Sequence, residues 1–384
     1  MTLPALPNRL DVAMVAGEAS GDLIASLAVA QLAAAGRRVG GIGGPRMAQA
    51  GFQVQVPMER LSVRGYVEVL RHLPGLLRLR ADLARQWSAQ RPGVFVGVDA
   101  PDFNLGLATK LRASGVRTVQ LVCPSIWAWR RERAPKIRAA VDEVLCVFPF
   151  EPDVLAKEGI VGRFVGHPLA DMLPATPDRA AARIRLGLPE HGAPIVALLP
   201  GSRRDEIKHL APRMIAAAAL IWQRIPEARF VLPAASGERR AELAQHLAQS
   251  EVVIQVLDGR AHDALEAADS VLVASGTATL EAALFHCPMV ITYAMPALSY
   301  WMMKGKGYLP WVGLPNILCN EWVVPELIQD AATPQALAEA VIKQLTDTAH
   351  AAAIGQRFAG LHAQLRQGFP SQCTQAIERH LNAA

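Results

Sequence analysis

The chain has 384 residues, of which 51% are hydrophobic. This allows two buried cores in domains of roughly 150 to 200 residues each and excludes a disordered chain. Lys and Arg number 39 against 34 Asp and Glu, a modest basic excess that suits phosphorylated ligands or an anionic membrane surface. The basic residues are scattered and the aromatic residues form no stacking series among them, so we expect no nucleic-acid partner.

Short apolar runs alternate with helical patterns along the chain, which predicts an α/β fold built from βα units on parallel sheets. In the first half the predicted strands are Val12–Ala16, Val94–Val98, Val116–Val122 and Val144–Phe148, and the predicted helices are Leu23–Ala35 and Asn104–Ala113. A further stretch, Tyr66–Leu79, mixes Leu with Arg, which is typical either of an interfacial membrane segment or of packed core helices.

The second half repeats this plan. Its predicted strands are Ile195–Leu199, Phe230–Leu232, Val252–Val256, Val271–Ala274 and Val290–Tyr293, and its predicted helices are Glu206–Arg224, Arg239–Leu247, Thr277–Phe285 and Pro334–Leu345. Two Rossmann-like domains that face each other would form a ligand cleft beside the carboxyl ends of both sheets.

A proline-rich stretch separates the two halves. Pro168, Pro174 and Pro177 disfavour a helix interior and keep the preceding residues extended, so this stretch is predicted to be a linker. The predicted boundaries are 1–168 for the N-terminal domain, 169–190 for the linker, 191–350 for the C-terminal domain and 351–384 for a helical tail.

The cysteines and the apolar segments predict a compartment. Five Cys, odd in number and far apart, fit neither a disulfide framework nor a zinc site, which indicates a reducing cytoplasm. Val12–Ala16 is too short for the apolar region of a signal peptide. The longest uncharged run, Cys287–Met303, contains prolines and falls short of a bilayer span, so we expect a soluble or peripheral protein.

The first candidate site is the segment Gly17-Glu18-Ala19-Ser20-Gly21-Asp22, directly after the first strand. Its glycines and small serine permit close approach of the backbone to a ligand, and the helix that follows begins with free N–H groups. An ordinary βα turn, with Ser20 or Asp22 capping the helix, explains the same residues.

Asp99 follows the strand Val94–Val98 and so lies at the carboxyl edge of the sheet, where α/β enzymes bind ligands. Asp102 comes after Pro101 and before a helical pattern, which favours a helix N-cap. Asp99 has no such structural duty. It is either a general base toward a hydroxyl or a turn residue that binds its own backbone.

The segment Pro124-Ser125-Ile126-Trp127-Ala128-Trp129-Arg130-Arg131 also follows a strand. Two tryptophans beside two arginines suit a sugar face or an acyl chain near a phosphate, although tryptophans in such a pattern also serve simply as packing.

Two loops of the second half predict a diphosphate site. Leu199–Glu206 and the helix start at Ser275–Glu281 each follow a strand, and free N–H groups with nearby hydroxyls bind anions. Arg203 would add a charge-assisted bond, and Glu281 either accepts the hydroxyls of a ribose or simply favours the helix start. The residues predicted to form this site are Ser202, Arg203, Ser275, Gly276, Thr277, Thr279 and Glu281.

Several other motifs are missing from the sequence. There is no Asp-x-Asp pair for a divalent cation, no zinc helix and no P-loop, so we expect no metal and no cofactor. His262 and Glu266 are four residues apart, but a solvated helix pair explains them better than metal ligation. Leu314-Pro315-Asn316 alone indicates only a loop.

Taken together, these motifs resemble the lipid-A-disaccharide synthases, a GT-B-like family of bacterial glycosyltransferases. The resemblance extends from Gly17–Asp22 to Leu314–Asn316 and includes Gly166-His167-Pro168-Leu169. It implies transfer of 2,3-diacylglucosamine from its UDP form to 2,3-diacylglucosamine 1-phosphate, which gives a β-1,6-linked disaccharide by inversion and without metal.

The resemblance also implies roles for individual residues. Asp99 corresponds to the base of the family, and Arg203 and Asn316 to residues implicated in activity; the role of Asn316 rests on the resemblance alone. The residues assigned to the acceptor or lipid side are Glu18, Ser20, Asp22, Trp127, Trp129 and Arg130.

The resemblance implies a cytoplasmic protein that contacts the inner membrane peripherally at its cytoplasmic face. The helical stretch after Pro370 would pack on its own N-terminal domain or on a second copy in a homodimer. Two alternatives stay open from the residues: an enzyme like UDP-N-acetylglucosamine 2-epimerase on the same fold, and a UDP-sugar-binding protein without catalysis.

Overall fold

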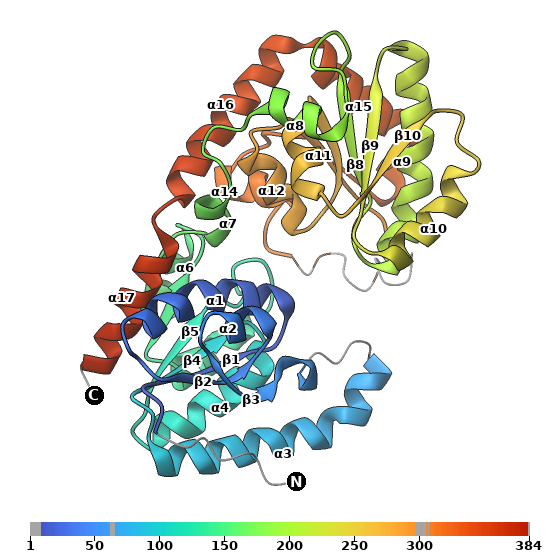
Figure 1. Ribbon diagram of the computed structural model, residues 1–384. Coiled ribbons are helices and arrows are strands. Elements are labelled where there is room, and N and C mark those ends of the chain that lie inside the picture. The colour runs from blue at the N-terminus through green and yellow to red at the C-terminus, as the bar shows by residue number, and fades with distance from the viewer. Residues whose placement is uncertain (1–8, 62–65, 297–300, 302–304, 306, 383–384) are drawn as a thin grey trace. The chain divides into compact units, whose positions relative to one another are not determined.

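A computed structural model describes residues 9–61, 66–296, 301, 305 and 307–382 (Figure 1). The chain forms two compact units. Unit 1 comprises Met1–Asp171 together with Leu365–Ala384, and unit 2 comprises Met172–Gln364. The chain therefore leaves unit 1 once and returns to it at its C-terminal end.

Unit 1 is built on a seven-stranded parallel sheet with the order β3-β2-β1-β4-β5-β6-β7. The strands are β1 (Val12–Ala16), β2 (Val39–Gly43), β3 (Gln53–Pro57), β4 (Val94–Val98), β5 (Arg117–Leu121), β6 (Glu143–Cys146) and β7 (Gly162–Phe164). All residues of β1 and β4 are buried, as expected for a parallel sheet covered on both faces. The strand order reverses between β1 and β4, and this is the switch point of the sheet.

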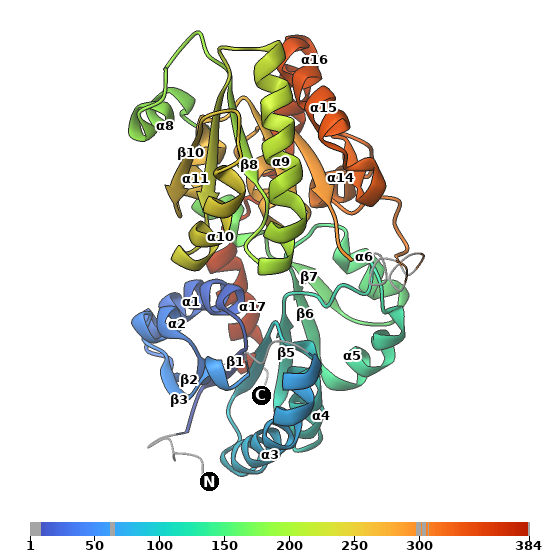
Figure 2. The same cartoon turned by 90° about the vertical axis from the view of Figure 1, so that its right-hand side faces the viewer.

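Helices cover both faces of this sheet, as Figure 2 shows. One face carries α1 (Ala19–Ala34), α2 (Pro45–Gln49) and α17 (Phe369–Asn382), and the other carries α3 (Tyr66–Gln90), α4 (Pro101–Ala113) and α5 (Ala134–Ala140). The short elements η1 (Met58–Arg60), η2 (Arg131–Arg133), α6 (Glu151–Lys157) and α7 (Pro168–Met172) complete the connections.

Unit 2 has a six-stranded parallel sheet with the order β10-β9-β8-β11-β12-β13. Its strands are β8 (Ile195–Leu199), β9 (Arg229–Ala234), β10 (Ile254–Asp258), β11 (Ser270–Ala274), β12 (Met289–Tyr293) and β13 (Glu326–Ile328). The order reverses between β8 and β11, so unit 2 repeats the plan of unit 1 with its own switch point.

The helices of unit 2 also lie on both faces of the sheet (Figure 1). One face carries α9 (Arg204–Arg224), α10 (Gly237–Leu247) and α15 (Pro334–Thr346), and the other carries α8 (Arg179–Leu186), α11 (Ala261–Ala267) and α12 (Thr277–Leu284). The remaining elements are α14 (Leu314–Cys319), η3 (Gln329–Ala331) and α16 (Thr348–Leu365).

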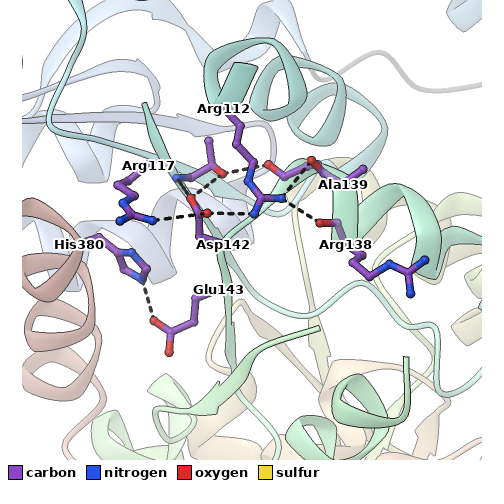
Figure 3. A network of polar contacts seen from close by, with 9 residues as sticks. Arg112, Arg117, Arg138, Ala139, Asp142, Glu143 and His380 are labelled. Carbon is purple, nitrogen blue, oxygen red and sulfur yellow. Dashed lines mark hydrogen bonds and ion pairs between the residues drawn. The ribbon is translucent and has the colours of Figure 1, made fainter. Parts of the chain in front are cut away.

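The C-terminal helix α17 is tied to the sheet of unit 1 by a buried carboxylate. Figure 3 shows His380 of α17 beside Glu143 at the start of β6, with His380 Nε2 at 2.8 Å from Glu143 Oε2. Arg163 Nε donates to the other oxygen of Glu143 at 2.7 Å. Burial alone would raise the pKa of Glu143, but His380 and Arg163 together hold it below its usual value. The ionised carboxylate thus helps to fasten the end of the chain.

The α/β prediction with two Rossmann-like halves is confirmed, and every predicted strand is present with ends shifted by a few residues at most. The sequence reading missed β2, β3, β7 and β13, as well as the continuous helix α3. The predicted linker 169–190 contains α8, which packs on α11 in unit 2 through ion pairs of Arg185 with Asp263 and Glu266. Among the helices described here, none is both long enough and apolar enough to span a bilayer.

Candidate active site

The switch point of unit 1 brings two of the sequence motifs together. β1 and β4 pair in parallel, with Ala16 opposite Val98, so the residues that follow them, Gly17 and Asp99, are neighbours. Gly17 N donates to Asp99 Oδ1 at 2.9 Å, and Glu18 N donates to Asp99 Oδ2 at 3.2 Å. The carboxylate of Asp99 therefore lies at the N-terminus of α1.

The second glycine of the first motif, Gly21, is required by the position of the Asp99 carboxylate. A side chain at Gly21 would collide with the carboxylate of Asp99. Neither Ser20 nor Asp22 caps α1, in contrast to the simpler explanation of the motif, because Asp99 accepts the N–H groups at this end. The small residues of the first motif thus make room for a carboxylate from the second.

The backbone at Asp99 is strained and firmly held. Asp99 and Ala100 both have positive φ angles, 51° and 36°. The buried amide of Asn104 donates to the carbonyl oxygens of Val15, Val98 and Asp99 at 3.2, 3.1 and 3.0 Å. Strain of this kind persists where surrounding contacts over-determine it, and it is concentrated at functional sites.

The surroundings of Asp99 also change its acidity. Burial raises the pKa of Asp99 to about 7; the nearby Glu18 adds to the rise, and the hydrogen bonds from Gly17 and Glu18 oppose it. A carboxylate with a pKa near the working pH combines sufficient ionisation with sufficient proton affinity to act as a general base.

Other residues of these motifs have structural roles instead. Asp22 is 2% exposed and accepts the N–H groups of Gly44, Arg46 and Met47, each at 3.0 Å, so it caps α2 and is not open to an acceptor. Asp102 is not the N-cap of α4 that the sequence suggested. That position belongs to Ala100, and Asp102 pairs with Arg133 at 3.0 Å.

A pocket of about 250 Å³ lies at this switch point. Its lining includes Glu18, Asp99, Trp129, Arg130 and Arg133, so four of the predicted acceptor-side or catalytic residues share one pocket. Ser20 is exposed but does not line it.

The two tryptophans of the third motif have different roles. Trp127 Nε1 donates to the buried Glu151 at 3.0 Å, and its ring meets Phe150 edge-on at 5.2 Å, so Trp127 anchors the loop. Trp129 is 37% exposed and lines the pocket, with the guanidinium of Arg130 at 4.1 Å from its ring centre.

The switch point of unit 2 carries the other pair of motifs. The loops after β8 and β11 line a pocket of about 470 Å³ that includes Ser202, Arg203, Ser275, Gly276, Thr277 and Glu281. Thr279 does not reach this pocket. Its hydroxyl is buried and donates to Gly276 O within the helix at 2.7 Å.

The two helices that begin at this pocket differ in their N-terminal caps. Glu206 of α9 accepts the N–H groups of Ser202 and Arg203 at 3.0 and 3.1 Å, and its other oxygen pairs with the Arg203 side chain at 3.0 Å. At α12 the N-cap is Gly276, which has no side chain to cap the helix. The start of α12 is therefore the end that offers N–H groups to an anion.

Glu281 of α12 has a partner that the sequence reading missed. His262 Nε2 lies 3.2 Å from Glu281 Oε2, and this hydrogen bond raises the pKa of His262 against the effect of burial. The predicted pairing of His262 with Glu266 is wrong, because Glu266 pairs with Arg185 at 2.6 Å. His262 lies on α11, the helix before β11, and Glu281 lies on α12, the helix after it. This closeness to the same strand is the only signal for the pair in the sequence.

Asn316 is fully buried and does not line the pocket. Its Oδ1 accepts the N–H groups of Val323 and Val324 at 2.9 and 3.0 Å. Its Nδ2 donates to Val324 O and to Glu326 Oε1, both at 2.9 Å.

Glu326, which the sequence reading also missed, connects Asn316 to the pocket. Its carboxylate accepts the N–H groups of Val312 and Gly313 at 2.8 and 3.0 Å. The carbonyl oxygen of Val312 in turn accepts the hydroxyl of Ser275 at 3.2 Å. Asn316 therefore stabilises the loop that contacts Ser275 without lining the pocket itself.

Comparison with known proteins gives a consistent picture. The family model for lipid-A-disaccharide synthetase matches residues 12–377. The lipid-A-disaccharide synthase of Burkholderia thailandensis is 51% identical over 382 residues, which cover 98% of this chain and 98% of that protein. The synthase of Burkholderia pseudomallei is 50% identical over 378 residues, 97% of each chain.

Solved structures share the fold at low sequence identity. The glycotransferase of kitacinnamycin has a TM-score of 0.65 at 17% identity and matches 97% of this chain and 100% of its own. MurG of Acinetobacter baumannii has a TM-score of 0.58 at 14% identity over 96% and 99% of the two chains. UDP-GlcNAc 2-epimerase from Neisseria meningitidis has a TM-score of 0.62 at 9% identity over 97% and 99%. The GT-B-like character of the two α/β units is thereby confirmed.

Proposed function

The chain belongs to the lipid-A-disaccharide synthase family and is a glycosyltransferase that forms the lipid A disaccharide, and we propose the following chemistry for it. It transfers 2,3-diacylglucosamine from the UDP-linked donor to the 6-hydroxyl of 2,3-diacylglucosamine 1-phosphate. A single displacement inverts the anomeric centre and gives a β-1,6 linkage with release of UDP. The alternatives of an epimerase and of a non-catalytic binding protein are not favoured, because relatives matching nearly the whole chain are named as the synthase.

The observation that carries the mechanism is the position of Asp99. A carboxylate with a raised pKa lines a pocket at the switch point of unit 1 and is fixed by the backbone of Gly17 and Glu18. We assign it as the base that removes the proton from the acceptor 6-hydroxyl while this oxygen attacks the donor. One base is sufficient for a single displacement, since no covalent intermediate has to be hydrolysed.

The donor is assigned to the pocket of unit 2. The uncapped start of α12 and the exposed guanidinium of Arg203 would stabilise the negative charge that grows on the departing diphosphate. Glu281 would accept hydrogen bonds from the ribose hydroxyls while His262 holds its second oxygen. These groups supply positive charge from the chain itself, so we propose a metal-independent transfer.

Both substrates carry acyl chains, and we propose that the protein contacts the cytoplasmic face of the inner membrane peripherally through α3. Leu73 and Leu77 of this helix are 41% and 45% exposed, whereas Leu79 is buried against the unit. Exposed leucines beside arginines on one helix suit the boundary between lipid head groups and acyl chains. We also propose that the protein forms a homodimer.

The experiment that tests the function is release of UDP by the purified chain from UDP-2,3-diacylglucosamine, with and without the 1-phosphate acceptor. We expect release to require the acceptor, with a disaccharide 1-phosphate found by mass spectrometry, and to persist in EDTA. Release without acceptor would indicate hydrolysis or elimination instead of transfer. Strong inhibition by EDTA, reversed by a divalent cation, would overturn metal independence.

A further inference from the structure

The pocket that contains Asp99 also contains a cation, the guanidinium of Arg130, which lies over an aromatic ring. It lies 4.1 Å from the ring centre of Trp129, and both side chains line the pocket together with Asp99. Its two basic neighbours are already paired: Arg131 with Glu158 at 3.8 Å and Arg133 with Asp102 at 3.0 Å. Within the part of the chain that the structure describes, no carboxylate forms an ion pair with Arg130.

The loop that presents Arg130 is held in a strained conformation. Arg130 has a φ angle of 58°, in the left-handed region that an arginine rarely adopts. Turn hydrogen bonds fix both sides of it: Trp129 N donates to Ser125 O at 3.1 Å, and Arg133 N donates to Arg130 O at 3.0 Å. Ile126 of the same loop is buried in the core. Arg130 is therefore presented by a rigid loop, and strain at such a point indicates a functional position.

Stacking leaves the binding capacity of this guanidinium intact. The guanidinium carbon lies over the indole ring, and a guanidinium that stacks on a ring keeps its N–H groups free at its edge, in the plane of the group. These edge donors match the oxygens of a phosphate, which binds arginine more strongly than a neutral acceptor does. A half-buried cation with no carboxylate partner in the described residues is a ready anion site.

The chemistry of the proposed reaction says which anion this is. Donor and acceptor carry the same diacylated glucosamine with the same free 6-hydroxyl, and they differ only at C1. One has UDP there, in a diphosphate diester, and the other has a phosphate monoester, which carries close to two negative charges at neutral pH. The acceptor position can distinguish them only by a contact at C1. The residue that makes this contact must line the same pocket as the base, because the base binds the 6-hydroxyl of the same sugar.

We infer that Arg130, stacked on Trp129, binds the 1-phosphate of the acceptor and thereby excludes the UDP-linked sugar from the acceptor position. The inference rests on the proposed function, because it uses Asp99 as the base at the other end of the sugar. It assigns acceptor specificity to one side chain. Trp129 serves as the platform that keeps this side chain in place.

The test measures the coupling between Arg130 and the phosphate. Wild type and Arg130→Ala are compared with 2,3-diacylglucosamine 1-phosphate and with the same acceptor lacking the phosphate, at saturating donor. We expect Arg130→Ala to lower kcat/KM about 10- to 100-fold with the phosphorylated acceptor and to leave it nearly unchanged with the other. The KM for the UDP-sugar should not change.

Arg131→Ala is the matched control, because Arg131 is adjacent in sequence, pairs with Glu158 and does not line the pocket. It should keep the activity of wild type with both acceptors. If Arg130→Ala is unstable, Arg130→Gln retains a side chain that can lie over Trp129 but lacks the charge, and it should show the same coupling. An equal loss with both acceptors, or no loss with either, overturns the inference. If wild type makes no disaccharide at all, it is the proposed function that has failed.

Discussion

The side-chain amide of Asn316 donates to Glu326 at 2.9 Å, and this carboxylate also accepts the backbone N–H groups of Val312 and Gly313. The only route from Asn316 to the pocket of unit 2 along the hydrogen bonds described above runs through Glu326 and Val312 to Ser275. Asn316 thus supports the pocket wall and does not touch its contents. A residue of this kind influences binding by positioning others.

Replacement of Asn316 by Ala should therefore affect stability and donor binding together. Four hydrogen bonds of a buried side chain are lost, so the free energy of unfolding should fall by about 2 to 5 kcal/mol. The KM for the UDP-sugar should rise several-fold, while the KM for the acceptor stays unchanged. Urea unfolding and steady-state kinetics measure these effects.

Asn320→Gly is the control for this substitution, since Asn320 is an exposed residue with a positive φ angle of 53° that glycine adopts easily. It should leave both quantities near those of wild type. A loss of kcat in Asn316→Ala, with unchanged stability and unchanged KM, would instead indicate direct participation in the chemistry.

Replacement of Asp99 by Ala should lower kcat by about 10²- to 10⁴-fold, because the attacking hydroxyl loses the carboxylate that the backbone N–H groups of Gly17 and Glu18 hold in place. Binding of UDP, followed by calorimetry, should be unaffected. Asp102→Ala is the matched control from the same motif, because Asp102 is exposed and paired with Arg133. Near-normal turnover by a folded Asp99→Ala protein would exclude Asp99 as the base.

The pKa of Asp99, raised to about 7 by burial, also predicts the pH dependence of the wild-type enzyme. The base acts only when ionised, so log kcat/KM should rise with pH below about 7 and level off above it. A profile that is already flat between pH 5 and 7 would argue against this assignment.

Replacement of His262 by Ala should weaken donor binding through Glu281. The hydrogen bond to Glu281 holds one carboxylate oxygen, and without it the carboxylate is less well oriented for a ribose. We expect the Kd for UDP to rise about 3- to 10-fold with little change in thermal stability. His246→Ala on α10 is the control; an equal effect of both variants would show that Glu281 needs no orientation by His262.

Replacement of Glu143 by Gln should loosen α17. The pKa of Glu143 is held below its usual value by His380 and Arg163 although burial opposes this, so its contribution to stability is present at neutral pH and is lost as the pH falls through its folded pKa. At pH 7 the variant should lose about 1 to 3 kcal/mol of stability. The difference from wild type should shrink as the pH falls below the usual pKa of a glutamate and the carboxylate takes up its proton. Glu378→Gln, at a more exposed ion pair of the same helix, should change stability by less than about 0.5 kcal/mol.

Replacement of Leu73, Leu76 and Leu77 together by Ser should reduce binding to vesicles of anionic phospholipid about tenfold or more, because the exposed Leu73 and Leu77 and the half-buried Leu76 supply the apolar area that enters the lipid. Sedimentation with vesicles measures the bound fraction. Val161→Ser, at a residue that is 61% exposed elsewhere on unit 1, is the control. Unchanged binding of the triple variant, with its circular dichroism intact, would exclude α3 as the contact.

The sequence predicted those elements whose patterns are local. The apolar runs that became β1, β4, β8 and β11 were recognisable because a strand covered on both faces is apolar throughout. The motifs that follow β8 and β11 were predicted to form one site, and they line one pocket because the carboxyl ends of neighbouring parallel strands meet at one edge. The motifs that follow β1 and β4 meet in the same way but were not paired from the sequence. β2 escaped detection because three of its five residues are Gly, and α3 because Pro74 and Gly75 interrupt its pattern.

What the sequence could not predict depends on partners that are distant along the chain. Asp22 looked like part of a ligand site, yet its three partners lie more than twenty residues away at the start of α2. The burial of Asn316 and its link to Glu326 require the path of the loop between them.

The return of the chain to unit 1 at Leu365 has a consequence for synthesis of the protein. Unit 2 is contiguous and can complete its core as soon as residue 364 has emerged from the ribosome. Unit 1 is made first but lacks α17 until residues 369–382 are released, and until then the face of α1 that α17 covers stays open. A stop codon within α17 would therefore destabilise the domain that was translated first.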